Sequence, residues 1–311
     1  MKLKVYRAGP ARDLSFRVSP TSREISSVGH YDIFDLAVAP GATVLSLLFE
    51  ARDRYDDSLA FRYSCRGAVC GSCAMLINRV PRLACRTQVE TLLRRRDMTG
   101  ENGDCTAAHP MGCTEGLSPF SPAIEDGEPW SAAEEVLVEP LPHLPVLKDL
   151  VVDMTTFYEF LRAVQPVLRP AEGAPDREYR MEPAAVRELE QYTNCILCGA
   201  CFGACPVCGE NSDYLGPAAL AQLYRFHIDP REARDGSRLV LADKPDGWWA
   251  CRFYANCRAV CPKGVPPNLA IGRARQELKP RDPRPLPAGE GRGEGGGTVG
   301  PNTEGEADAE N

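Results

Sequence analysis

The first third of the chain carries the apolar pattern of β-strands. Short runs of alternating or clustered apolar residues are separated by turn residues, and they cover 3–8, 31–39, 74–78 and 82–89. The last two runs flank Asn78-Arg79, which predicts a hairpin. Residues 43–55 instead have apolar residues at helical spacing behind Thr43, a candidate helix cap. Strands packed on one helix predict a small α+β unit.

Residues 97–135 interrupt this pattern. They contain prolines and glycines but few large apolar residues, which predicts an irregular surface insertion. Residues 136–150 are extended and punctuated by proline, as is typical of an edge strand followed by a linker. We therefore expect a first domain over residues 1–145.

From Asp153 onward the apolar period is that of helices. Apolar residues recur at helical spacing in four segments, 154–168, 183–192, 216–228 and 266–278. This pattern predicts an all-helical second domain over residues 146–279. Residues 280–311 are rich in Gly and Glu and have no apolar run that could form a core, so we expect a disordered tail there.

Charge and hydropathy exclude some classes of function. The net charge of −7 lies partly in the acidic tail, and the nearly neutral remainder lacks the basic footprint of a nucleic-acid-binding protein. The N-terminus has no apolar core of signal-peptide type, and no apolar run reaches the length of a membrane span. Any membrane role must therefore come through a partner or an edge-on contact.

The 14 cysteines are bunched rather than spread along the chain. Disulfide frameworks belong to small secreted domains, in which cysteines are distributed between elements. Here neighbouring cysteines are mostly two to four residues apart, which favours metal ligation. Zinc is the first alternative, because it takes paired C-x2-C knuckles.

An internal repeat holds most of these cysteines. "CILCGACFGACP" begins at Cys195, and the related "CRFYANCRAVCP" begins 56 residues later at Cys251. The first run has the C-x2-C-x2-C-x3-C-P spacing of bacterial ferredoxins, in which the fourth cysteine ligates the other cluster. Three thiolates on one tight loop can hold three corners of a cubane, while the fourth, at the start of a helix, points away.

This crossing divides the repeat into two ligand sets. The first set predicts a [4Fe-4S] cluster and consists of Cys195, Cys198, Cys201 and Cys261. The second set, Cys205, Cys251 and Cys257, lacks a fourth cysteine because Tyr254 stands at that position, which predicts a [3Fe-4S] cluster. Cys208 is an alternative fourth ligand, although a free buried thiol is the commoner state, and structural zinc is the alternative for the whole region.

The N-terminal region has a different cysteine motif. "CRGAVCGSC" followed by Cys85 matches the C-x4-C-x2-C…C signature of plant-type [2Fe-2S] ferredoxins. The expected ligands are Cys65, Cys70, Cys73 and Cys85. Gly67 and Gly71 allow the loop to bring amide N–H groups towards the sulfurs. Zinc is again the alternative.

The other candidate ligands are weaker. Cys105, His109 and Cys113 lie in the insertion, where free thiols are favoured over a disulfide or a labile metal site. His30, His143 and His227 are isolated, which indicates surface or core roles. With no nucleotide loop and no acid–base pair, three clusters in one chain predict electron conduction between partners that carry out the bond chemistry.

These motifs resemble those of the iron–sulfur subunit of succinate dehydrogenase and fumarate reductase, over about residues 1–280. The similar stretches are "YSCRGAVCGSCAMLIN", "LPVLKDLVVDMTTFY", "CILCGACFGACP", "YLGPAALAQLYRFHIDPR" and "NCRAVCPKGVPPNLAIG". The resemblance implies a β-grasp plant-type ferredoxin domain followed by an all-α bacterial-type ferredoxin domain, with the same three ligand sets.

The resemblance also implies partners and a place in the cell. An FAD-containing flavoprotein subunit would interconvert succinate and fumarate. Electrons would pass through the [2Fe-2S], [4Fe-4S] and [3Fe-4S] clusters to a quinone, menaquinone or ubiquinone, held against membrane anchor subunits. FAD and any haem b would belong to partner subunits. The chain would then be an electron-transfer subunit, peripheral to the cytoplasmic face of the inner membrane, with no catalytic residue of its own.

The quinone pocket of the family does not carry over residue by residue. Some relatives have a tryptophan pair where this chain has Gly209 and Glu210, and a histidine where it has Arg252. The expected quinone vicinity is Pro206, Trp249, Arg252 and Tyr254. These departures leave open a ferredoxin-like subunit of another dehydrogenase or of a thiol- or disulfide-linked fumarate reductase. A cluster-based or zinc-based scaffold or sensor is the remote alternative.

Overall fold

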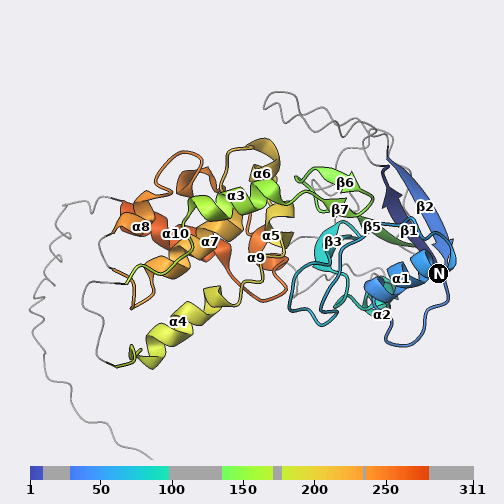
Figure 1. The fold of residues 1–311 in the computed structure, drawn as a ribbon, viewed down its shortest axis with the longest axis horizontal. Coiled ribbons are helices and arrows are strands. Elements are labelled where there is room, and N and C mark those ends of the chain that lie inside the picture. Colours follow the sequence, from blue (N-terminus) through green and yellow to red (C-terminus); the bar gives the residue numbers. More distant parts are fainter. Residues whose placement is uncertain (10–28, 98–134, 171–176, 234–235, 280–311) are drawn as a thin grey trace, which may run out of the picture. The chain divides into compact units, whose positions relative to one another are not determined.

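A five-stranded mixed sheet organises the first half of the chain (Figure 1). The computed structural model describes residues 1–9, 29–97, 135–170, 177–233 and 236–279. The strand order is β2-β1-β5-β3-β4. The strands are β1 (Lys2–Arg7), β2 (His30–Asp35), β3 (Ala74–Ile77), β4 (Val80–Leu83) and β5 (Glu135–Glu139).

Strand β5 occupies a central place in this sheet. It lies parallel to β1 and antiparallel to β3, with Val136 opposite Leu3 and Val138 opposite Ile77. The prediction of an edge strand over the first part of 136–150 was wrong. Proline begins only at Pro140, after the strand has ended, so every residue of β5 keeps its N–H for the sheet.

The predicted hairpin is confirmed as β3 and β4. Asn78 and Arg79 both have positive φ, 47° and 61°, as a two-residue turn that follows the twist of the strands requires. The predicted strand over 82–89, however, ends at Leu83. The chain then turns, and helix α2 (Val89–Asp97) follows, which the strand-rich reading of residues 1–96 missed.

Helix α1 (Val44–Arg54) is confirmed together with its cap. The Thr43 hydroxyl accepts a hydrogen bond from the Ser46 N–H, and the Ser46 hydroxyl accepts one from the Thr43 N–H. This reciprocal capping box satisfies amides that have no partner inside the helix. The buried face of α1 packs with the sheet in one hydrophobic cluster that includes Leu3, Leu48 and Val138.

After the short antiparallel pair β6 (Val146–Lys148) and β7 (Val151–Val152), the regular elements of the described residues are helical. The four predicted segments are confirmed as α3 (Thr155–Ala163), α4 (Pro183–Thr193), α7 (Gly216–His227) and α10 (Pro267–Leu278). Helix α3 ends before the predicted residue 168, because Pro166 cannot continue it. The shorter helices are α5 (Ala200–Gly203), α6 (Pro206–Glu210), α8 (Ser237–Val240), η1 (Trp248–Ala250) and α9 (Asn256–Ala259).

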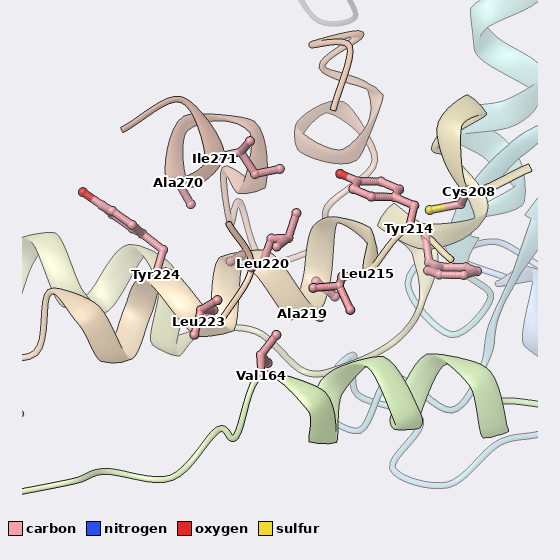
Figure 2. Packing of buried hydrophobic residues seen from close by; sticks show 14 of the residues in the cluster. Val164, Cys208, Tyr214, Leu215, Ala219, Leu220, Leu223, Tyr224, Ala270 and Ile271 are labelled. Carbon is pink, nitrogen blue, oxygen red and sulfur yellow. The ribbon is translucent and has the colours of Figure 1, made fainter. Parts of the chain in front are cut away.

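Helix α7 is the centre of the helical half. It is buried along almost its whole length, as expected for a helix that is apolar on all sides. It packs against α3, α4, α5, α8 and α10. Figure 2 shows Ala219, Leu220 and Leu223 of α7 among residues such as Val164 and Ile271 from neighbouring segments.

Met1–Leu278 forms one compact unit that contains two hydrophobic clusters, one around the sheet and one around α7. The insertion between Asp97 and Glu135 and the tail after Lys279 lie outside the described residues, as do Cys105, His109 and Cys113. None of the helices in the described ranges has the length and hydrophobicity of a membrane span.

Candidate metal centres

The loop before β3 wraps its backbone around the thiol of Cys65. The N–H groups of Gly67, Val69 and Cys70 all donate to Cys65 Sγ, at N–S distances of 3.4, 3.3 and 3.3 Å. The Cys65 N–H in turn donates to Cys70 Sγ at 3.4 Å. Such converging amides stabilise negative charge on sulfur.

Backbone conformation explains this convergence. Arg66, Ala68 and Gly71 have positive φ values of 54°, 57° and 76°, which curl the loop so that successive N–H groups face its inside. The hairpin then returns Cys85 to the loop, where the Ala68 N–H donates to Cys85 Sγ at 3.3 Å. The first three cysteines of the predicted set therefore lie on one loop, and the hairpin of β3 and β4 brings the fourth, Cys85, back to it.

The thiols of this loop differ in how easily they ionise. Hydrogen bonds from the Ser72 hydroxyl and from the Cys65 and Ser72 amides lower the pKa of Cys70 to about 6. Burial raises the pKa of Cys73 to about 12. Cys70 is therefore largely thiolate at neutral pH, whereas Cys73 needs a bound cation to lose its proton.

Two arginines beside the loop were not found from the sequence. The Arg66 guanidinium lies 4.6 Å from the centre of the Phe49 ring, and that of Arg52 lies 4.9 Å from it. Phe61 and Tyr63 complete this aromatic group. Arg66 belongs to the cysteine loop itself, and Arg52 shares its aromatic contacts. The two guanidinium groups thus place positive charge near a loop whose thiolates would be negative.

The cysteines of the helical repeat line two separate cavities. The first has about 410 Å³ of empty space, part of it open to solvent. Its lining includes the thiol-bearing residues Cys195, Cys198, Cys201 and Cys261. Cys261 belongs to the second run of the repeat, so this cavity combines residues from both runs.

The thiols of the first cavity resist ionisation. Burial and the neighbouring thiols raise the pKa of Cys201 strongly, and burial raises that of Cys198 to about 11. Burial also raises the pKa of Cys195, although the Leu197 amide and the Gln222 side chain oppose it by hydrogen bonding. A donor set of this kind fits a group that supplies its own positive charge, because a bound metal deprotonates a coordinating thiol.

The second cavity has about 320 Å³ of empty space, again partly open to solvent. It is lined by Cys205 from the first run and by Cys251 and Cys257 from the second. Tyr254, the residue at the missing cysteine's place, is also part of the lining and is 51 % exposed.

Cys208 lies outside the lining of both cavities. It is buried in the core around α7, and its thiol hydrogen-bonds to Cys205. This hydrogen bond, with help from the Cys208 and Val207 amides, lowers the pKa of Cys205. Cys208 therefore acts as a hydrogen-bond donor to a thiol that lines the second cavity.

The residues expected near a quinone are only partly assembled. Pro206, Arg252 and Tyr254 line the second cavity, whereas Trp249 does not. Arg252 pairs with Glu210 at 2.6 Å, and Trp249 Nε1 donates to Asp243 Oδ1 at 2.7 Å.

Arg275 was not found from the sequence, yet it braces this region. Its Nε donates to the Trp248 carbonyl at 2.7 Å and its Nη2 to the Cys251 carbonyl at 2.8 Å. The same guanidinium lies over the rings of Trp249 and Phe253. One side chain of α10 therefore holds the loop that starts at Cys251.

The N-terminal loop and the first cavity adjoin each other. A Cβ added at Gly71 would lie 2.8 Å from Cys198 Cβ, so this close approach requires glycine. Arg86 also donates to the Pro262 carbonyl at 2.7 Å. The backbone of the N-terminal cysteine loop therefore contacts Cys198, which lines the first cavity.

The isolated histidines take surface and core roles. His30 lies 3.5 Å from Asp32, and His227 lies 2.6 Å from Glu277. His143 Nε2 is buried without a hydrogen-bond partner among the described residues. Over the same residues, no three His, Cys, Asp or Glu side chains are grouped so that they could hold a single metal ion.

Comparison with known families assigns both cysteine regions to a class of protein. Residues 2–159 match the family described as a 2Fe-2S iron-sulfur cluster binding domain, and residues 191–265 match the 4Fe-4S dicluster domain. The chain thus has the domain composition of an iron–sulfur protein with two cluster-binding regions.

Curated relatives narrow this class to one family. The chain is 30 % identical over 266 residues to the fumarate reductase iron-sulfur subunit of Haemophilus influenzae, covering 82 % of this chain and 88 % of the relative. It is 34 % identical over 258 residues to that subunit of Mycobacterium tuberculosis, with 82 % and 89 % covered. The succinate dehydrogenase iron-sulfur subunit of Paracoccus denitrificans is 34 % identical over 242 residues, with 78 % of each covered. The chain belongs to the family of fumarate reductase and succinate dehydrogenase iron–sulfur subunits.

The fold agrees with this family. A chain of the Mycobacterium smegmatis Sdh1 complex in the apo form superimposes with a TM-score of 0.66 at 23 % sequence identity. The match covers 89 % of this chain and 94 % of the other.

Proposed function

We propose that this chain is the electron-transfer subunit of a succinate dehydrogenase or fumarate reductase complex. It would conduct electrons between the FAD of a flavoprotein subunit and a quinone. The bond chemistry would occur in the partner, because the cysteines that line the cavities are all assigned to clusters. Family membership and the arrangement of the cysteines support this proposal.

Three cluster sites follow from the cysteine sets. A [2Fe-2S] cluster would be held by Cys65, Cys70, Cys73 and Cys85, a [4Fe-4S] cluster by Cys195, Cys198, Cys201 and Cys261, and a [3Fe-4S] cluster by Cys205, Cys251 and Cys257. When bound, these clusters supply one-electron carriers. The protein's part is to hold the sulfurs, exclude bulk water and place hydrogen-bond donors and charges around them.

One observation carries the proposal. Each helical cavity is lined by cysteines from both runs of the repeat, and the last cysteine of each run before its proline, Cys205 or Cys261, lies in the cavity of the other run. A pair of independent zinc knuckles would keep each run's cysteines together. Crossed ligation is instead the arrangement of two-cluster ferredoxins.

The remaining assignments belong to the same proposal. We assign residues 1–145 to a β-grasp domain and 146–279 to an all-α ferredoxin domain. FAD and any haem b would lie in the flavoprotein and anchor subunits. Pro206, Arg252 and Tyr254 line the second cavity and would face menaquinone or ubiquinone, with the chain peripheral to the cytoplasmic face of the membrane.

Metal analysis combined with electron paramagnetic resonance (EPR) spectroscopy tests this function. We expect iron and acid-labile sulfide in the amounts of one [2Fe-2S], one [4Fe-4S] and one [3Fe-4S] cluster, with three distinct signals. The complex should also reduce a quinone with succinate or oxidise a quinol with fumarate. Zinc in place of iron would refute the proposal, and copurification with a flavoprotein that turns over neither substrate would redirect it to another dehydrogenase.

A further inference from the structure

Tyr214 is a deeply buried residue at the second cavity that the cluster assignments leave without a role. It lies between α6 and α7 and is 1 % exposed. Figure 2 shows its ring among the buried residues of the helical core, close to Cys208. Its hydroxyl is buried and has no hydrogen-bond partner among the described residues. A buried hydroxyl without a hydrogen-bond partner lowers the stability of the folded protein. We therefore expect the Tyr214 hydroxyl to have a partner when the cavity is filled.

The surroundings of this hydroxyl are sulfur. Tyr214 lines the second cavity together with Cys205, Cys251 and Cys257. Cys251 and Tyr214 belong to the same cavity lining, although the Tyr214 hydroxyl forms no hydrogen bond to the Cys251 thiol. Asn268 lines the same cavity, and its side-chain oxygen is likewise buried without a partner.

The first cavity differs in this respect. None of the buried, unpartnered side-chain atoms of the described residues belongs to its lining. Among the described residues, the second cavity therefore holds a buried hydroxyl without a partner, whereas the first cavity holds no such atom.

We propose that Tyr214 is a positioning residue for the group held by Cys205, Cys251 and Cys257, an inference that rests on the proposed function. Its O–H donates a hydrogen bond to sulfur in this cavity. A donor of this kind stabilises the added negative charge of the reduced state and raises the reduction potential. One electron enters on reduction, and the proton stays on the tyrosine oxygen.

The test is Tyr214→Phe in the full complex, because this change removes one oxygen and keeps the ring. In an EPR-monitored redox titration, the three-iron signal should shift to lower potential. We expect an equilibrium constant for reduction about tenfold smaller, a shift of about 59 mV for one electron. The potentials of the other two clusters should stay as in the wild type.

Tyr192→Phe is the matched control. Tyr192 is also fully buried with an unpartnered hydroxyl, but it lines neither cavity. This variant should leave all three potentials unchanged. A potential that moves equally in both variants would show a general packing effect and overturn the proposal.

A second measurement uses the wild type alone, so that the proposal remains testable if Tyr214→Phe fails to assemble. After exchange into D2O, electron–nuclear double resonance at the three-iron signal should show the loss of a coupled exchangeable proton in addition to that of the Phe253 N–H, which donates to Cys251 Sγ at 3.4 Å. No such proton, or an unchanged potential in Tyr214→Phe, would refute the role of Tyr214. Wild-type protein without any three-iron signal would instead refute the proposed cluster assignment.

Discussion

The two cavities of the helical half come from one sequence repeat, yet they are built differently. The first is lined by thiols at four positions. The second is lined by three cysteines, with Tyr254 at the remaining place and Tyr214 nearby. A repeat of the cysteine spacing therefore does not make the two sites equivalent.

The difference also concerns what surrounds each site. Phe253 and Tyr254 beside the second cavity are 45 % and 51 % exposed, and the Arg252–Glu210 ion pair lies next to them. The first cavity adjoins the N-terminal cysteine loop through Gly71. One cavity thus has a protein neighbour that bears further thiols, while the other presents aromatic and charged side chains to solvent. This asymmetry suits a chain that receives electrons at one end and delivers them at the other.

The largest expected effect comes from removing the cysteine that crosses between the runs. Cys261→Ser should abolish the four-iron signal while the three-iron signal persists, because Cys261 lines the first cavity. Mössbauer and EPR spectroscopy of the purified complex would measure this. Cys205→Ser is the reciprocal variant. It should abolish the three-iron signal before it affects the four-iron signal. The opposite pattern would show that each run ligates its own cluster.

Replacing the residue that distinguishes the two cavities should make them alike. Tyr254→Cys supplies a fourth thiol to the second cavity, so the three-iron cluster that we propose there should become a four-iron cluster with a lower potential, since potential depends on cluster type and charge. Loss of the three-iron EPR signal on oxidation measures the change. Tyr158→Cys, at an exposed tyrosine on α3, is the control and should leave the signal in place. A wild type that already contains two four-iron clusters would contradict the assignment.

A smaller effect is expected from the arginine that braces the second cavity. Arg275→Met removes the hydrogen bonds to the Trp248 and Cys251 carbonyls, which should cost about 2 kcal/mol of stability, because bonds from charged donors are worth about 1.5–3 kcal/mol. The thermal unfolding temperature of the complex should fall by several degrees. Arg273→Met on the same helix breaks an exposed pair with Glu188 and should cost less than about 1 kcal/mol. Equal losses would show that the bracing contacts contribute nothing specific.

The smallest effect should follow Cys208→Ala. This thiol lies outside the lining of the second cavity and contributes one hydrogen bond to Cys205. Iron content and the three-iron signal should persist, with a modest fall in potential from the lost donor. If iron is lost or the cluster type changes, Cys208 is a ligand, and the second cavity resembles the first more closely than we infer.

Local rules predicted the elements whose signals are local. The Thr43 cap, the Asn78-Arg79 turn and the apolar period of α7 each depend on a few adjacent residues, and each was recovered. Helices α5 and α9 were missed because each has only four residues and follows a residue with positive φ, Gly199 or Ala255. Elements this short depend on tertiary packing, because so few hydrogen bonds do not offset the cost of nucleating a helix.

The sequence by itself determined how the thiols are grouped along the chain, and the ferredoxin spacing predicted that the last cysteine of each run joins the set of the other run. Only the tertiary structure decided what faces those thiols. Tyr214 and Arg275 lie outside both cysteine runs, yet Tyr214 lines the second cavity and Arg275 of α10 holds the Cys251 carbonyl. Hydrophobic periodicity shows that such residues are buried, but packing alone decides which atom each of them meets.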